Sequence, residues 1–178
     1  MIIRQTDAVD LTDILTVHES AFGQNDEALL TADLLADPSA APRLSLIALL
    51  DGQPVGHILF TRAGIIGAEE NVTASILAPL AVVPDVQGRG IGGELIRDGL
   101  HQLADEGTDL VFVLGHPTYY PRFGFQPAGA RGLIAPYPIP PQHADAWMVH
   151  ELREGTVGTV QGRVMCADAL NKPEYWEE

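Results

Sequence analysis

The 178-residue sequence has a single cysteine, Cys166, and no long apolar run. One thiol can build neither a disulfide framework nor a zinc site with several cysteine ligands, so we expect a reducing compartment. A membrane-spanning helix needs roughly 20 apolar residues in a row, and a secretory leader needs a basic segment followed by an apolar one. The sequence offers neither pattern. We therefore expect a cytoplasmic protein with no membrane partner.

Basic residues are also scarce. The chain has 10 lysines and arginines against 24 acidic residues, a formal net charge of −14, and Lys172 is its one lysine. Binding to nucleic acid depends mainly on lysine and arginine contacts to phosphates, so we expect no nucleic-acid partner. An acidic surface favours cationic small molecules modestly, although simple solubility explains the same charge.

Hydrophobic residues make up 46% of the chain, which is enough to build the core of one compact domain. No internal repeat, low-complexity block or linker divides the sequence. We expect a single domain over residues 1–178, with an extended C-terminal segment after about residue 126.

Apolar spacing predicts helices over residues 10–22, 27–36 and 88–106, and strands over residues 44–50, 55–62, 75–83, 110–114, 147–152 and 159–167. The turn-forming residues 51–54 predict an antiparallel hairpin between the first two strands. The segment from residue 75 to residue 114 has the length of a strand, helix and strand in a right-handed crossover. The predicted fold is an α/β (α+β) domain with a mixed, mostly antiparallel sheet flanked by helices.

The most informative stretch is an apolar strand that passes through a short loop into a glycine-rich helix start. The first turn of a helix leaves about four backbone N–H groups without partners, which makes it an anion site. Glycines at positions 88, 90 and 92 would let a pyrophosphate approach those groups, and Arg89 can add a charge. The structural alternative is that the glycines allow a tight turn and close packing of the helix on the sheet.

Two other kinds of glycine-rich loop bind nucleotides. Gly88, Gly90 and Gly93 also satisfy the G-x-G-x-x-G spacing of dinucleotide folds. Those folds place the glycines after their first strand and an acidic residue at the end of the next one. Here a hairpin comes first, and Asp109 lies at the start of the following strand, so this interpretation is a minor alternative. A nucleoside triphosphate loop requires Gly-Lys-Ser/Thr, which the sequence lacks.

With these residues the chain resembles the GCN5-related N-acetyltransferases. Their signature, Gln/Arg-x-x-Gly-x-Gly/Ala after an apolar strand, matches Gln87, Gly90 and Gly92. A second match is the segment from Tyr120 to Phe125, which is similar to the family's Tyr-x-x-x-Gly-Phe. The resemblance covers residues 1 to about 125. The extended tail and residues 115–120 are typical of the YhbS-type branch of the family.

The resemblance implies an acyl-CoA N-acyltransferase fold and an N-acetyltransferase that transfers an acetyl or other acyl group from acetyl-CoA to a primary amine by direct attack in a ternary complex. It implies that the backbone of Leu80, Ala81, Val82 and Val83 pairs with the pantetheine and that Gln87, Gly88, Arg89, Gly90, Ile91 and Gly92 hold the pyrophosphate. Tyr120 would protonate the departing sulfur, and its alternative role is packing in an aromatic cluster. No metal is predicted. The alternative function is a non-catalytic acyl-CoA-binding sensor of the same fold.

Other parts of the site stay open at this stage. Many family members carry an asparagine on a longer loop before the tyrosine, which this chain lacks, so some CoA contacts must differ. His116 could deprotonate the incoming amine, because an imidazole exchanges protons near neutral pH; Glu19, His57 and Ser75 are weaker candidates. The aromatic residues Trp147, Tyr175 and Trp176 are interpreted as core or tail-docking residues. The acceptor is expected to be a small-molecule or peptide amine, with polyamines, aminoglycosides and protein N-termini favoured by the acidity, and the protein to be a monomer or homodimer.

Overall fold

The computed structural model describes residues 1–68 and 72–177. Its main helices are α1 (Leu11–Phe22), α2 (Asp26–Ala36) and α3 (Ile91–Asp105). Its strands are β1 (Ile2–Gln5), β2 (Leu44–Leu50), β3 (Gln53–Ile65), β4 (Ala74–Val82), β5 (Leu110–Leu114), β6 (Gln126–Pro127), β7 (Leu133–Ile134), β8 (Trp147–Glu151) and β9 (Gly162–Met165). Short 3-10 turns connect many of these elements.

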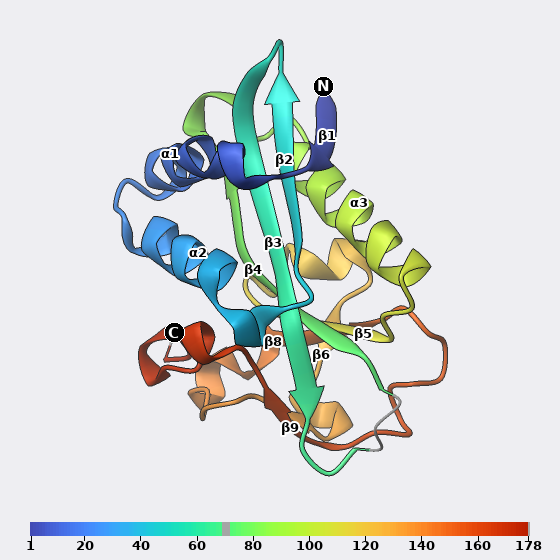
Figure 1. Ribbon diagram of the computed structural model, residues 1–178. Helices are drawn as coiled ribbons and strands as arrows, with labels where there is room; N and C mark the ends of the chain where they lie inside the picture. Colours follow the sequence, from blue (N-terminus) through green and yellow to red (C-terminus); the bar gives the residue numbers. More distant parts are fainter. Residues whose placement is uncertain (69–71, 178) are drawn as a thin grey trace.

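The main sheet has the strand order β1-β2-β3-β4-β5-β8-β6 (Figure 1). Along this path only β4 and β5 are parallel, and α3 connects them, as the predicted crossover requires. All other neighbours on the path are antiparallel. The long strand β3 also pairs with β9, which extends the sheet into the C-terminal part of the chain. The mixed, mostly antiparallel sheet expected from the sequence is therefore confirmed.

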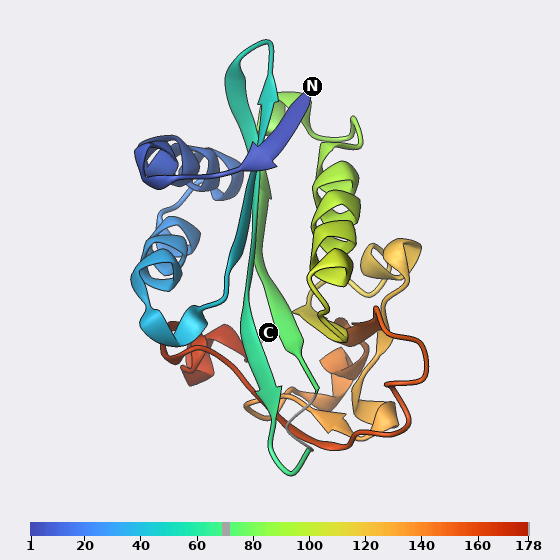
Figure 2. The same cartoon turned by 45° about the vertical axis from the view of Figure 1, so that its right-hand side comes forward.

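Helices cover both faces of the sheet, as Figure 2 shows, with α1 and α2 on one face and α3 on the other. The helix α3 buries the stripe Ile91, Leu95, Ile96, Leu100 and Leu103, which is the helical spacing seen in the sequence. This stripe belongs to one hydrophobic cluster, and α2 joins a second cluster that contains residues of the C-terminal segment. Within the described residues, no helix combines the length and apolar character needed to cross a lipid bilayer.

The structure differs from several of the predicted elements. The helix α3 begins at Ile91 rather than at residue 88, because Gly88 and Gly90 have φ values of 80° and 83°, outside the right-handed helical region. The strand β1 was not predicted; it pairs with β2 at the edge of the sheet. The last predicted strand shrinks to Gly162–Met165.

Candidate functional site

The candidate site is an opening between β4 and β5. The two strands pair at three positions only, and the last pair joins Ile76 to Phe112. Beyond this pair β4 continues to Val82 without pairing to β5, and a cavity of about 740 Å³ lies at the divergence. The cavity is lined by Phe22, Leu30, Ile76, Leu77, Ala78, Pro79, Leu80, Val113, Leu114, Gly115, His116, Pro117, Tyr120, His143, Ala146, Leu170, Tyr175 and Trp176.

The backbone of β4 turns alternate residues toward this opening. The N–H of Val83 donates to the carbonyl of Val55 on the β3 side at 2.9 Å. In an antiparallel ladder the bonding direction alternates, so Ala81 also points its backbone groups to β3. Leu80 and Val82 point theirs toward the opening. Of the four residues predicted to pair with the pantetheine, the register thus turns Leu80 and Val82 toward the opening and Ala81 and Val83 toward β3.

The N-terminus of α3 borders the same opening. Its first residue follows Gly90, and no side chain in the described part of the chain caps the helix. A Cβ atom built at Gly88 or at Gly90 would meet no heavy atom within 4 Å, so space is open in front of the first turn. A Cβ atom at Gly92 would lie 2.9 Å from the hydroxyl of Tyr119 and 3.8 Å from the Leu80 side chain. Unpaired N–H groups and open space together fit a diphosphate.

The predicted phosphate-binding residues have distinct places around this helix start. The Gln87 amide nitrogen donates to the carbonyl oxygen of Val82 at 2.8 Å, so this side chain fastens the loop to β4. The Arg89 side chain is exposed to solvent in the loop just before α3. Ile91 is buried on the core side of α3, so only its backbone N–H is available to a ligand.

Tyr120 lies in the cavity wall and is 8% exposed. Its ring packs so closely on Gly115 that a Cβ atom there would come within 3 Å of the ring carbon atoms. The rings of Tyr119 and Phe125 meet it edge-on, with centroids 5.2 Å and 5.7 Å away. Burial raises the pKa of Tyr120, and the neighbouring Tyr119 raises it further. The Tyr120 hydroxyl therefore stays protonated at neutral pH and can donate a proton.

Two histidines line the cavity. His116 comes from the loop after β5, as the sequence suggested. His143 comes from the 3-10 segment before β8, and the sequence analysis missed it because no local pattern connects it with β4. The other candidate bases, Glu19, His57 and Ser75, are absent from the cavity lining described here.

His57 belongs instead to a buried chain of hydrogen bonds. Its Nδ1 lies 2.8 Å from His18 Nε2, and its Nε2 lies 2.8 Å from Ser45 Oγ. Thr6 continues the chain with a 2.7 Å hydrogen bond to Ser45. Burial lowers the pKa of both imidazoles, and the proximity of His18 lowers that of His57 further, because two neighbouring imidazoles resist carrying charge together. The two histidines are therefore neutral structural groups that connect α1 to β3.

The C-terminal segment closes the cavity on the side of α1 and α2. Trp176 is 2% exposed, donates from Nε1 to the Leu170 carbonyl at 3.1 Å, and stacks edge-on against Trp147 at 5.5 Å. The interpretation of these tryptophans as core and tail-docking residues is correct. Trp176 and Tyr175 also line the cavity, which no local sequence pattern predicts.

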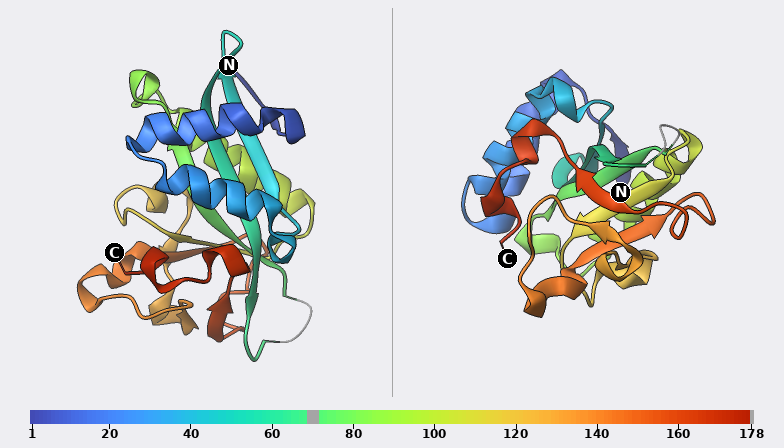
Figure 3. Two further views of the ribbon diagram at one scale, coloured as in Figure 1. Left: turned by 60° about the vertical axis from the view of Figure 1, so that its left-hand side comes forward. Right: turned by 90° about the horizontal axis from the view of Figure 1, so that it is seen from below.

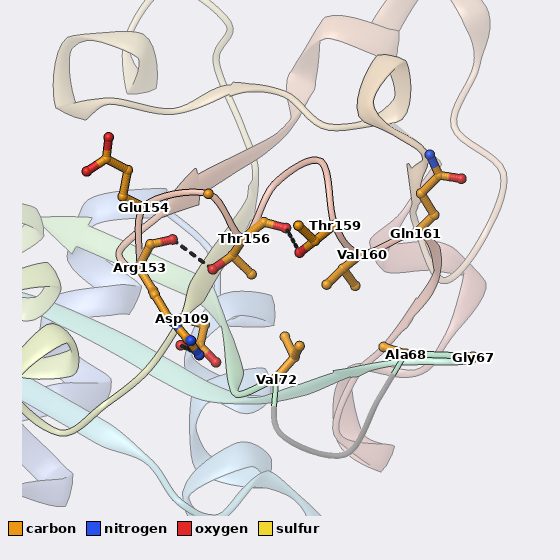
Figure 4. Close-up of a pocket in the computed structure, with 11 residues that line it drawn as sticks. Gly67, Ala68, Val72, Asp109, Arg153, Glu154, Thr156, Thr159, Val160 and Gln161 are labelled. Atoms are coloured by element: carbon orange, nitrogen blue, oxygen red, sulfur yellow. Dashed lines mark hydrogen bonds and ion pairs between the residues drawn. The ribbon is translucent and has the colours of Figure 1, made fainter.

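A second cavity of about 540 Å³ lies beside the start of β5, where Asp109 precedes the strand (Figure 4). Its most buried charged group, Asp109, accepts a hydrogen bond from the Thr73 N–H at 2.9 Å and lies 3.9 Å from Arg153. These contacts join the residue before β4 to the segment after β8 and give Asp109 a structural role. In the described part of the chain, no three histidine, cysteine or acidic side chains group in a way that could hold a metal ion.

Comparisons with known proteins agree with this arrangement. The sequence model of the acetyltransferase (GNAT) domain matches residues 2–128. The chain is 52% identical over 164 residues to the uncharacterized N-acetyltransferase YjhQ of Escherichia coli K12, covering 92% of this chain and 90% of that protein. It is 31% identical over 173 residues to the uncharacterized N-acetyltransferase YhbS of the same organism, covering 97% and 99% of the two chains.

Two solved structures are similar over nearly the whole chain. The crystal structure of Escherichia coli YhbS in complex with CoA has a TM-score of 0.85 and 30% identity, covering 96% of this chain and 92% of that one. A GNAT family acetyltransferase from Brucella melitensis in complex with acetyl-CoA has a TM-score of 0.75 and 33% identity, covering 95% and 97% of the two chains. The divergence of β4 from β5 and the glycine-rich start of α3 agree with these similarities. The chain therefore belongs to the GNAT family of acetyltransferases, as the similarities show.

Proposed function

We propose that the protein is an N-acetyltransferase that transfers the acetyl group of acetyl-CoA to a primary amine. The observation on which this depends is the divergence of β4 and β5 beside the open glycine-rich N-terminus of α3. An extended arm fits along the free edge of β4, and a diphosphate fits at the helix. Two relatives at 30% and 33% identity are described as complexes with CoA and acetyl-CoA, which supports the same ligand here.

The residues around the opening supply the groups that the transfer needs. The amine nitrogen bonds to the acetyl carbon while the carbon–sulfur bond breaks, and negative charge grows first on the carbonyl oxygen and then on the sulfur. The Leu80 N–H, which points into the opening, is placed to stabilise the oxygen; such a donor is typically worth about 10²–10³ in rate. The ammonium first loses one proton to solvent or to a cavity histidine, which leaves a neutral nitrogen that can attack. Tyr120 then gives its proton to the departing sulfur and regains one from the nitrogen of the tetrahedral intermediate through solvent, so that a thiol and a neutral amide are formed.

Release of free thiol from acetyl-CoA, measured over a panel of primary amines, tests this function. We expect amine-dependent thiol release together with an acetylated amine detected by mass spectrometry. Calorimetric titration with CoA tests the binding of the coenzyme separately from the transfer of the acetyl group. CoA binding without turnover of any amine would instead favour the non-catalytic sensor, and the lack of both would refute the ligand assignment.

A further inference from the structure

The part of the β4–β5 cavity that faces away from α3 is apolar. It is built by the last residue of α1, by α2 and by the C-terminal segment, through Phe22, Leu30, Leu170, Tyr175 and Trp176. Among the described residues that line the whole cavity, no side chain is Asp, Glu, Lys or Arg. The ionisable groups in the wall are the two histidines and two tyrosines, so the wall offers no carboxylate to a cation.

The same elements are strongly acidic outside the cavity. Residues 1–43 contain eight acidic and two basic side chains, and residues 166–178 contain four acidic and one basic. Figure 3 shows α1 and α2 side by side with the C-terminal segment directly below them. A negative field at a cavity mouth raises the local concentration of cations and their rate of arrival. The field attracts a protonated amine, although no carboxylate among the described lining residues can form an ion pair with it inside the cavity.

The two features together select among amines. An amine that reacts loses its charge, because its nitrogen becomes a neutral amide. A second ammonium group on the same molecule would keep its charge inside the cavity, and burying a charge without a partner is strongly unfavourable. A hydrocarbon body would instead bind favourably, because moving apolar surface from water to the apolar wall lowers the free energy.

We infer that the acceptor is a small primary monoamine with an aliphatic or aromatic hydrocarbon body. This inference rests on the proposed function and narrows its acceptor class. Net charge alone does not distinguish a monoamine from a polyamine or an aminoglycoside. The acidic exterior recruits the single ammonium group, and the cavity holds the body against Leu30, Leu170 and Tyr175. The cavity volume of about 740 Å³ is shared with the acetyl-bearing arm, so the acceptor is small.

A pair of amines of equal size tests the inference. Hexylamine and 1,5-diaminopentane have the same number of heavy atoms, and only the second has a second ammonium group. We expect hexylamine to have a kcat/KM at least tenfold higher, and 2-phenylethylamine to be a substrate as well. Spermidine and kanamycin extend the panel to polycations. Equal or better kcat/KM for 1,5-diaminopentane, spermidine or kanamycin would overturn the inference and leave the acetyltransferase function intact.

Two variants of α1 locate the effect in the cavity wall. Phe22 lines the cavity and is 41% exposed, while Leu11, at the other end of the same helix, is 42% exposed and absent from the lining described here. Phe22→Glu and Leu11→Glu therefore add the same charge at equal exposure. We expect Phe22→Glu to shift the hexylamine to 1,5-diaminopentane ratio at least tenfold toward the diamine, and Leu11→Glu to keep the wild-type ratio. An unchanged ratio in Phe22→Glu, or an equal shift in both variants, would contradict a role for this wall.

The failure of the proposed function has its own signature. If no amine in the panel is acetylated while CoA binds, the transferase function is wrong and this inference falls with it. If polycations alone are acetylated, the function stands and the inference is wrong.

Discussion

Among the residues that the structure describes, Tyr120 is the one tyrosine that is both buried and part of the cavity wall. We expect Tyr120→Phe to lower kcat by about 10²–10⁴, the usual contribution of a general acid, because the sulfur then leaves without a proton. CoA affinity should be unchanged, since the ring and its packing on Gly115 remain. Steady-state thiol release and calorimetric titration measure the two quantities.

Tyr137→Phe is the matched control for this variant. The Tyr137 hydroxyl donates to the Asn171 carbonyl and is absent from the described cavity lining. Its removal should leave kcat within about twofold of the wild-type value. A Tyr120→Phe enzyme as fast as this control would show that another group, or water, protonates the sulfur.

The buried pair His18 and His57 makes the stability of the fold depend on pH. Burial lowers the pKa of His18 from 6.5 to about 4, so the unfolded chain takes up a proton between these pH values that the folded chain does not. The free energy of unfolding therefore falls as the pH drops below 6.5. At pH 5 the loss is about 2 kcal/mol for His18 alone, and His57 adds to it.

Urea denaturation at pH 7 and pH 5 measures this loss. A double variant, His18→Leu with His57→Leu, should be nearly as stable at pH 5 as at pH 7, whereas replacing the exposed His101 by glutamine should preserve the wild-type difference. If wild-type stability is the same at both pH values, the pair is not held neutral by burial.

At the scale of the element, the N-terminus of α3 is the proposed anion site. Gly90→Asp places a carboxylate where the diphosphate is expected, so we expect CoA binding to become undetectable by calorimetry. Gly107→Asp is a matched control at the other end of α3. Gly90 and Gly107 both have positive φ, 83° and 91°, and open space around a Cβ atom, so the backbone costs are similar. Loss of CoA binding in both variants would point to a general loss of fold rather than to the site.

The elements differ in how well the sequence predicts them. Leu110–Val113 are buried on both faces, so an unbroken apolar run was enough to identify β5 and its parallel partner. The four residues of β1 are mostly exposed and show no alternation, and only pairing with β2 makes them a strand. The start of α3 was misplaced because the glycine-rich segment from Gly88 was counted as helix, whereas the positive φ values of Gly88 and Gly90 put both residues before its first turn.

In the candidate site, too, some residues can be predicted from local sequence patterns and others cannot. Gln87, Gly90 and Tyr120 lie in short segments whose spacing is visible in the sequence, and these segments border one opening. The alternation that separates Leu80 from Ala81 depends on the register with β3, which no local pattern encodes. His143 and Trp176 reach the cavity from segments far along the chain, through packing that only the folded molecule defines.

At the scale of the whole molecule, the C-terminal segment is part of the core. Trp176 is buried against Trp147, which in turn stacks on Phe112 of β5 at 5.2 Å. We expect Trp176→Ala to lower the free energy of unfolding by about 3–5 kcal/mol, the usual cost of removing a buried aromatic ring. Denaturant titration measures this change, with the half-exposed Met165→Ala as control. A loss below about 1 kcal/mol would mean that the tail is only loosely attached.

The last residues of the chain form part of the cavity wall. In the proposed reaction, the two substrates would therefore contact parts of the chain that lie far apart in the sequence. In the proposed reaction the acetyl-CoA would contact β4 and the start of α3, in the middle of the sequence, whereas the acceptor would contact the cavity residues from α1, α2 and positions 170–176. Swapping this terminal stretch between homologous enzymes should therefore transplant a preference for one amine over another while the dissociation constant for coenzyme A stays the same. Sequence changes in this short terminal segment can therefore alter the acceptor side of the cavity without touching β4 or the start of α3.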